Sequence, residues 1–186
     1  MAVMPLKLEA ACSQLHRGGV IAYPTEGVWG IGCDPFNRHA VERLLAIKGR
    51  SLHKGLILVA ASIDQFSPFL VGLDSGQRAT LGASWPGPNT WLVPDNGTAP
   101  AWIRGAHDSV ALRVTDHPLV AELCRCFGGP IVSTSANPAG RPVARYAWQI
   151  RRQLPQLDYL LHGALGRARG PSQIRDLVTG AIVRGA

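Results

Sequence analysis

A cluster of hydroxyl and amide side chains follows a short apolar stretch of the chain. Residues 130–132 read Pro-Ile-Val, and residues 133–137 read Ser-Thr-Ser-Ala-Asn. The apolar stretch predicts a buried strand, and in open α/β sheets ligands bind where such strands end. Ser133, Ser135 and Asn137 are short polar side chains with a low ordering cost, which suits the phosphates and ribose of a nucleotide. The same residue types are typical of a helix N-cap or an Asx-turn, so both roles stay open.

A second polar segment follows the predicted strand 20–23. Residues 24–32 read Pro-Thr-Glu-Gly-Val-Trp-Gly-Ile-Gly and predict a loop. Its glycines permit close backbone approach and positive φ values, as they would in a tight structural turn. Thr25 offers a hydroxyl that both donates and accepts hydrogen bonds. Glu26 is suited to holding an amine and equally suited to a buried bond with the backbone.

Arg113 is the single charge in the apolar segment 109–114. The alternation of side chains along a strand places it on the same face as Ser109 and Ala111. A charge that points into the protein is costly unless it is paired. Its partner is therefore either a buried Asp or Glu, or an anionic ligand such as a phosphate or an amino-acid carboxylate.

Lys48 and Arg50 lie at the end of a predicted helix. A cation in the last turn of a helix is favoured by the helix dipole whatever its function. Together with Lys54, Arg113 and the polar cluster at 133–137, they would form a pocket selective for phosphates. Arg supplies a planar fork to such a pocket and Lys a compact charge.

The elements that must position these residues follow from the apolar pattern. The clearest helix covers residues 38–48, with Asn37 as its cap and Gly49 at its end, and a second helix follows the dipeptide 117–118. Between helical segments and Gly/Pro turns, the chain predicts strands at 20–23, 56–60, 91–93, 110–114, 131–132, 159–161 and 174–178. This alternation predicts an α/β (α+β) fold.

Six motifs in order along the chain resemble the YrdC-like family of threonylcarbamoyl-adenylate synthases. A single motif such as Lys-x-Arg is weak evidence, but six in the family's order are specific. The resemblance implies one YrdC-like catalytic domain over residues 1–186, of the short type, with a single twisted, open, mixed sheet flanked by helices. The motifs are Tyr-Pro-Thr-Glu at 23–26, Lys-x-Arg at 48–50, Pro-Gly-Pro-x-Thr at 86–90, Arg113, Ser-x-Ser-Ala-Asn at 133–137 and Pro-Ser at 171–172.

The resemblance also implies roles for individual residues. Two cations, Lys48 and Arg50, would be catalytic. The implied ATP-binding set is Lys48, Arg50, Ser133, Ser135 and Asn137; the implied threonine-binding set is Thr25 and Arg113; further candidates are Thr90, Arg141 and Ser172.

The implied activity is that of a nucleotidyltransferase. It would use L-threonine, bicarbonate and ATP to make L-threonylcarbamoyl-adenylate with release of diphosphate, and Mg²⁺ would enter with the ATP. The product would pass to other tRNA-modification proteins for threonylcarbamoylation of the adenosine beside the anticodon.

The sequence departs from the usual family pattern at a few positions. Gly27, Trp29, Ser51 and Ala139 stand where the family commonly has Thr, Tyr, Pro and Ser. The chain also lacks the histidine that many longer members place just after residues 54–58. The resemblance therefore leaves part of threonine recognition unassigned.

The net charge of +7 is unevenly distributed. Residues 1–140 hold eleven Lys and Arg against ten Asp and Glu, whereas residues 141–186 hold eight Arg against two Asp. A basic field of this kind favours polyanions such as nucleotides or RNA. A non-catalytic RNA-binding protein with a role in RNA or ribosome maturation is therefore the alternative function. The basic segment around Arg145, Arg151 and Arg152 reads equally well as a solvated helix face.

Several other classes of protein are not indicated. The chain has no phosphate-binding Gly-x-x-x-x-Gly-Lys motif and no Gly-x-Ser-x-Gly elbow, and its six histidines lack metal-ligand spacing, so no protein-bound transition metal is expected. The opening residues lack the apolar core of a signal peptide, and no apolar run reaches the roughly 18–20 residues of a membrane span. A cytoplasmic protein without a membrane partner is expected.

Overall fold

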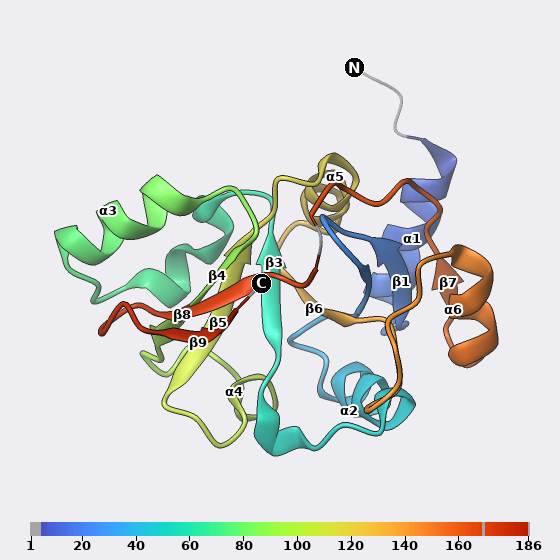
Figure 1. Ribbon diagram of the computed structural model, residues 1–186, viewed down its shortest axis with the longest axis horizontal. Coiled ribbons are helices and arrows are strands. Elements are labelled where there is room, and N and C mark those ends of the chain that lie inside the picture. Colours follow the sequence, from blue (N-terminus) through green and yellow to red (C-terminus); the bar gives the residue numbers. More distant parts are fainter. Residues whose placement is uncertain (1–4, 169, 186) are drawn as a thin grey trace.

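The computed structural model describes residues 5–168 and 170–185 and contains a nine-stranded sheet flanked by helices (Figure 1). The sheet order is β7-β1-β2-β6-β3-β5-β4-β8-β9. Three pairs are parallel (β1 with β7, β3 with β5, β4 with β8) and the other five are antiparallel, so the predicted open mixed sheet is confirmed. The strands are β1 (Ile21–Pro24), β2 (Trp29–Gly32), β3 (Ile57–Ala60), β4 (Asn89–Pro94), β5 (Ser109–Val114), β6 (Ile131–Ser135), β7 (Tyr159–Leu160), β8 (Gln173–Asp176) and β9 (Ile182–Arg184).

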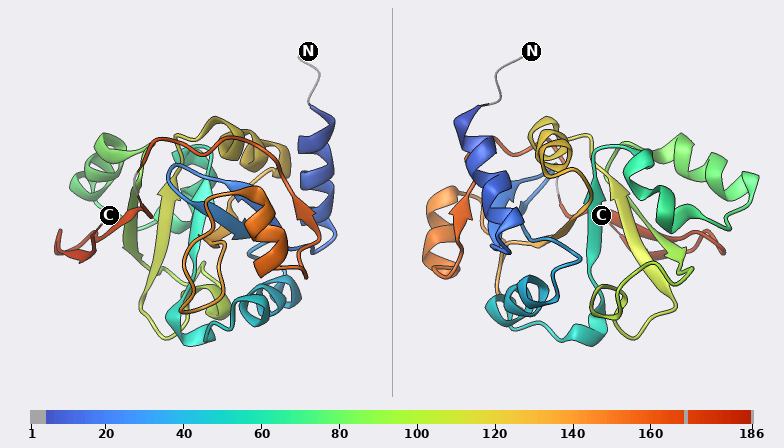
Figure 2. Two further views of the ribbon diagram at one scale, coloured as in Figure 1. Left: turned by 45° about the vertical axis from the view of Figure 1, so that its right-hand side comes forward. Right: turned by 180° about the vertical axis from the view of Figure 1, so that it is seen from behind.

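Helices cover the sheet on more than one side. α1 lies behind β1 in Figure 1 and in front of it in the reversed view of Figure 2, next to α5. None of the helices among the described residues is long and apolar enough to cross a membrane. The α-helices are α1 (Leu6–His16), α2 (Arg38–Lys48), α3 (Ser75–Ser84), α4 (Ala101–Arg104), α5 (Pro118–Phe127) and α6 (Ala147–Gln153), and the 3₁₀ segments are η1 (Leu52–Lys54) and η2 (Ile63–Leu70).

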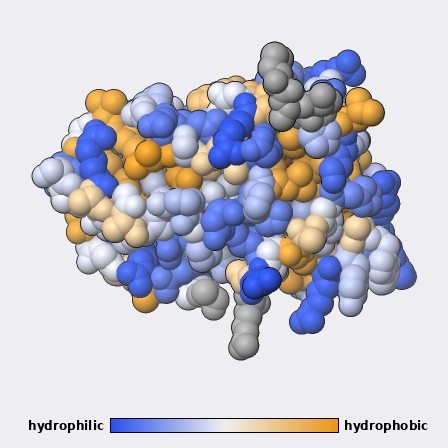
Figure 3. Space-filling model, turned by 90° about the horizontal axis from the view of Figure 1, so that it is seen from above, coloured by the Kyte–Doolittle hydropathy of each residue, from blue (hydrophilic) through white to orange (hydrophobic). Residues whose placement is uncertain are grey.

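The side-chain alternation of β1 divides the core between two clusters. Ile21 and Tyr23 pack with α1 and α5, whereas Val20 and Ala22 pack in the larger cluster that contains α2. Both faces of β1 are therefore buried. On the surface, hydrophilic and hydrophobic residues are interspersed in the view from above (Figure 3).

α2 forms where the sequence predicts it. The side chain of Asn37 accepts a hydrogen bond of 3.1 Å from the amide of Ala40, and Gly49 ends the helix with φ at 61°. The left-handed conformation costs Gly little because it has no Cβ. The helix therefore ends immediately before Arg50.

The segment 24–32 differs from the predicted loop, because residues 29–32 form β2 and pair antiparallel with β1. The expected close approach is confirmed. A Cβ on Gly27 would lie 2.2 Å from the carbonyl oxygen of Gly170, and one on Gly32 would lie 2.0 Å from that of Val132. The expected positive φ values are wrong for the glycines of this segment. Glycine is needed at positions 27 and 32 because a neighbouring backbone carbonyl occupies the place of a Cβ.

Candidate active site

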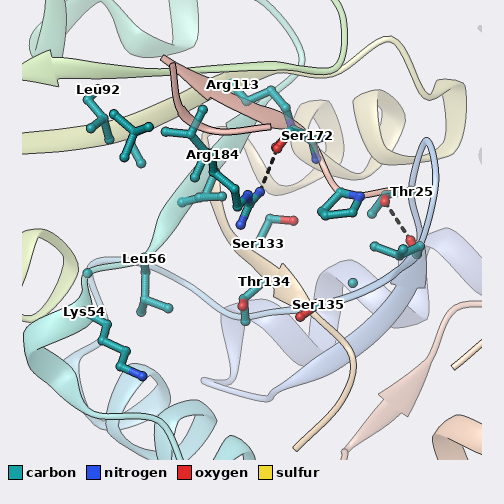
Figure 4. Close-up of a pocket in the computed structure, with 18 of the residues that line it drawn as sticks. Thr25, Lys54, Leu56, Leu92, Arg113, Ser133, Thr134, Ser135, Ser172 and Arg184 are labelled. Carbon is teal, nitrogen blue, oxygen red and sulfur yellow. Dashed lines mark hydrogen bonds between the residues drawn. The ribbon is translucent and has the colours of Figure 1, made fainter. Parts of the chain in front are cut away.

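A cavity of about 350 Å³ opens at the end of β6, between the β1–β2 turn and the β8–β9 hairpin (Figure 4). The carboxyl end of a strand is the expected place for a ligand. Ser109, Ala111 and Arg113 all line the cavity, so the predicted shared face of β5 is confirmed. Of the sequence-predicted site residues, the lining includes Thr25, Arg50, Arg113, Ser133, Ser135 and Ser172, and it omits Lys48, Thr90, Asn137 and Arg141.

Arg113 forms a buried ion pair with Glu26. Its Nη1 lies 2.7 Å from Glu26 Oε2, and the two side chains are 7% and 8% exposed. The hydroxyl of Thr115 donates a second hydrogen bond, of 2.5 Å, to Glu26 Oε1. Burial raises the pKa of Glu26, but the charge of Arg113 and the Thr115 hydroxyl together hold it below its ordinary value. The sequence left two kinds of partner open for Arg113, a buried acid or an anionic ligand. The structure shows the buried acid, Glu26, and Arg113 also lines the cavity where a ligand would bind.

A different end of the cavity carries cations without acidic partners. Arg50, Lys54 and Arg184 line the cavity, and no ion pair within the described chain involves them. Arg50 Nη2 donates to the carbonyl oxygen of Gly55 at 2.9 Å. Arg184 Nη2 donates to the carbonyl oxygen of Ser172 at 2.7 Å, as drawn in Figure 4. These guanidiniums are held by neutral carbonyl groups, which do not compensate their charge.

Burial and neighbouring positive charges lower the pKa values of the arginines that line this part of the cavity. Burial lowers the pKa of Arg50, and burial together with the charges of Arg50 and Arg113 lowers the pKa of Arg184. Among the described lining residues Glu26 is the only carboxylate, and Arg113 already engages it. This part of the cavity therefore offers uncompensated positive charge, which suits a ligand with several negative charges.

Lys48 lies behind the loop that follows β6. Its side chain is buried, and its ammonium donates to the carbonyl oxygens of Ser135 and, at 2.8 Å, of Asn137. Burial, with a contribution from the charge of Arg50, lowers the pKa of Lys48 to about 8. The structure thus places Lys48 where it supports the loop, and its contact with ATP stays a prediction.

The other predicted residues occupy three kinds of position. Asn137 shapes the turn, since its side-chain amide donates to the carbonyl oxygen of Arg141 at 2.5 Å. Arg141 itself is exposed. Thr90 is fully buried, and its hydroxyl lies 2.7 Å from that of Ser172, which does line the cavity.

Arg184 is the site residue that sequence reasoning missed. It is brought to the cavity by β9, which pairs antiparallel with β8. The available signal was the apolar pair before it, Ile182 and Val183, after the glycine turn at 180 that reverses the chain. Nothing in its spacing connects it to Arg50.

Known proteins share this fold and sequence. The family model Sua5_yciO_yrdC, described as telomere recombination, matches residues 13–186. A relative from Cellvibrio japonicus, named threonylcarbamoyl-AMP synthase, is 57% identical over 179 residues, which cover 96% of this chain and 95% of that protein. One of the same name from Pseudomonas aeruginosa is 54% identical over 185 residues, which cover 99% and 100%.

Two solved structures are similar as well. P. abyssi Sua5 complexed with L-threonine has a TM-score of 0.88 at 27% identity, and the match covers 98% of this chain and 54% of that one. This chain thus spans about half the length of that protein. E. coli YciO has a TM-score of 0.84 at 24% identity, covering 97% of this chain and 90% of that one, and supports the fold alone. The fold and the cavity place this protein among the α/β proteins of the Sua5/YciO/YrdC type. The chain belongs to the Sua5/YciO/YrdC family.

Proposed function

We propose that this chain is a threonylcarbamoyl-AMP synthase, which converts L-threonine, bicarbonate and ATP into L-threonylcarbamoyl-adenylate and diphosphate. The observation that carries the proposal is the division of one cavity into a charge-balanced end, Glu26 with Arg113, and an end with the uncompensated cations Arg50 and Lys54, while a third uncompensated cation, Arg184, is close enough to feel the charges of both Arg50 and Arg113. An amino acid carries one charge of each sign, whereas ATP is a polyanion. The names of relatives at 52–57% identity support the same activity.

The balanced end is assigned to L-threonine. Thr25 and Ser172 also line the cavity; the hydroxyl of Thr25 donates to the carbonyl oxygen of Val28 at 2.6 Å, and that of Ser172 lies 2.7 Å from the hydroxyl of Thr90. Arg113 has donors left over after its bond to Glu26 and would hold the substrate carboxylate. The complex of P. abyssi Sua5 with L-threonine supports an amino-acid site in this fold.

The uncompensated end is assigned to the phosphates of ATP. Arg50 is the residue of the predicted catalytic pair that faces the cavity, and Lys54 and Arg184 add two further cations. Ser133 and Ser135 line the cavity and are suited to the ribose and the α-phosphate. Lys48 would support this site from behind the loop.

The reaction needs positioning more than covalent chemistry by the protein. The amine of threonine combines with bicarbonate to give a carbamate and water, and a carbamate oxygen then attacks the α-phosphorus while diphosphate leaves. Charge builds up on the phosphoryl oxygens, which preorganised cations such as Arg50 stabilise. Mg²⁺ would enter as the ATP complex. No group of three or more possible metal ligands is present among the described residues.

The cellular setting follows from the same assignment. A single catalytic domain over residues 1–186 would work in the cytoplasm and pass its product to tRNA-modification proteins that act beside the anticodon. The mixed anhydride of such a product is prone to hydrolysis, so the reaction that consumes it must follow soon after.

RNA contact is a second candidate role, and one observation favours it. Tyr146, the N-cap of α6, and Trp148, in its first turn, are 61% and 60% exposed, and the exposed Arg145, Arg151 and Arg152 belong to the same segment. Aromatic rings and guanidinium groups are the side chains on which unpaired RNA bases stack. The relatives' names favour an enzyme over a purely RNA-binding protein. RNA contact is therefore proposed as an addition to catalysis.

The activity is tested with purified protein, ATP, bicarbonate and labelled threonine. Diphosphate and a labelled adenylate are expected only when threonine and bicarbonate are both present, because the carbamate is the nucleophile. Hydrolysis of ATP to ADP without threonine as the main reaction would contradict the proposal and favour a phosphatase-like site.

A further inference from the structure

A buried hydroxyl lies directly behind the balanced end of the cavity. Thr115 follows β5, is 2% exposed and is absent from the described cavity lining. Its hydroxyl donates to Glu26 Oε1 at 2.5 Å and accepts from the amide N–H of His117 at 3.1 Å. Because an amide nitrogen can only donate, the single hydroxyl proton of Thr115 must point at Glu26. The orientation of this hydroxyl is thereby fixed by the start of α5.

Glu26 is held at both carboxylate oxygens. Oε1 accepts from Thr115, and Oε2 accepts from Arg113 at 2.7 Å. The main-chain carbonyl of Glu26 also accepts from the amide of Ala168 at 2.9 Å. A carboxylate with both oxygens engaged and its backbone fixed has little freedom to rotate. The plane of Glu26 therefore determines where the guanidinium of Arg113 lies.

Arg113 has most of its hydrogen-bonding capacity unused. Within the described chain its one hydrogen bond is the bond to Glu26, and its Nε is buried without a partner. A guanidinium has five N–H donors in a rigid fork that matches a carboxylate. The direction of this fork decides how well it meets an incoming carboxylate.

We infer that Thr115 is a positioning residue for the amino-acid end of the cavity: acting through Glu26, it orients Arg113 toward the carboxylate of the substrate. This inference rests on the proposed function for the identity of the amino acid. Thr115 touches no lining surface itself, so its effect must pass through Glu26 and Arg113. It should therefore change the affinity for threonine and leave the phosphate end, at Arg50 and Lys54, unaffected.

The test compares three variants in steady-state kinetics. Thr115→Val removes the hydroxyl at nearly constant volume and is expected to raise KM for L-threonine roughly tenfold, the scale of one charge-assisted hydrogen bond. KM for ATP and kcat should change less than about twofold, because the reacting groups are untouched. Thr115→Ser keeps the hydroxyl and should restore the threonine KM. Thr80→Val is the matched control, since the Thr80 hydroxyl on α3 bonds only the carbonyl oxygen of Gly76.

Calorimetric binding of L-threonine and of ATP, measured separately on the same samples, distinguishes the possible failures. If the native protein binds no threonine, the proposed function fails. If the native protein binds threonine and Thr115→Val binds it equally well, the positioning role is wrong. Equal losses of threonine and ATP affinity would also overturn it, because they indicate a general structural defect. If the valine variant does not fold, Thr115→Cys, a weaker donor of similar size, should give an intermediate threonine KM, and an unchanged KM would again overturn the inference.

Discussion

The two ends of the cavity both hold cations close to the protein interior, but the partners of these cations differ. At one end Arg113 is neutralised by Glu26 within the protein. Arg50, at the other end, and Arg184, whose pKa is lowered by the charges of both Arg50 and Arg113, are held only by backbone carbonyls. A balanced site is complete without its ligand, whereas an uncompensated site gains stability when a polyanion arrives. The difference indicates that mutation of the first end should affect folding most and mutation of the second end should affect catalysis most.

The largest effect is expected from breaking the balanced end. Arg113→Met leaves the carboxylate of Glu26 buried without its cation, which costs about 3–5 kcal/mol of folding free energy. Denaturant unfolding at neutral pH measures this loss. The double variant Glu26→Gln/Arg113→Met removes both charges and should recover part of the stability. If the double variant is no more stable than Arg113→Met, the ion pair does not account for the loss.

The pH dependence of the same pair has a definite sign. In the native protein the pKa of Glu26 lies below its ordinary value of 4.5, so its stabilising contribution is present above that pH and is lost as the pH falls through the lower, folded-state pKa. In Arg113→Met burial remains without the opposing cation, which raises the pKa of Glu26 and favours the protonated form. The stability difference between the two proteins should therefore shrink as the pH falls, beginning above 4.5 at the raised pKa of the variant and continuing down to the lowered pKa of the native protein. A constant difference across that range would show that Glu26 is not the cause.

The next largest effect is expected at the uncompensated end. Arg50→Ala removes a cation that faces the cavity, and kcat/KM for ATP should fall by roughly 10²-fold, about 3 kcal/mol of transition-state stabilisation. Stability should change little, because no acidic partner is left behind. Arg38→Ala is the control, since Arg38 is exposed and paired with Glu42 on the surface of α2. Loss of stability with unchanged turnover would assign Arg50 to the helix end alone.

The two ends were not equally predictable from the sequence. A helix over about residues 38–48 was predicted correctly because its cap and its terminating glycine are local signals. The direction in which Arg113 points was also predictable from local sequence, because side chains alternate between the two faces of a strand. All seven predicted strands overlap observed ones, but β2 and β9 were missed because one is glycine-rich and the other is short.

What the sequence does not contain is the distance between segments. Glu26 and Arg113 are 87 residues apart, and only the sheet brings them together. Lys48 and Arg50 are two residues apart, yet one faces the loop from behind and the other faces the cavity. The conformation of Gly49 separates them, and a linear Lys-x-Arg motif does not specify that.

Lys48 lines neither end of the cavity, so its mutation tests the support of the loop after β6 separately. Lys48→Met removes the donor for two loop carbonyls, and a loss of about 1–3 kcal/mol is expected. The native pKa of about 8, against an ordinary value of 10.5, means that the unfolded chain binds more protons between these pH values. Native stability should therefore rise relative to Lys48→Met from pH 8 to 10.5, by up to about 3 kcal/mol. Thermal unfolding of both proteins across this range measures the slope, and a flat or falling difference would contradict the assignment.

The smallest effect is expected away from the cavity, on the exposed arginines of α6. Arg151→Glu/Arg152→Glu should weaken tRNA binding and reduce its salt dependence, by roughly 1–2 in the slope of log K against log salt concentration, because fewer counterions are released. Synthesis of the adenylate should be retained, since neither arginine lines the cavity. The control reverses two exposed arginines elsewhere, Arg38→Glu/Arg125→Glu, and produces the same change in net charge. If the control weakens tRNA binding equally, net charge alone explains the effect; if neither double variant changes the affinity or the slope, α6 makes no contact with RNA.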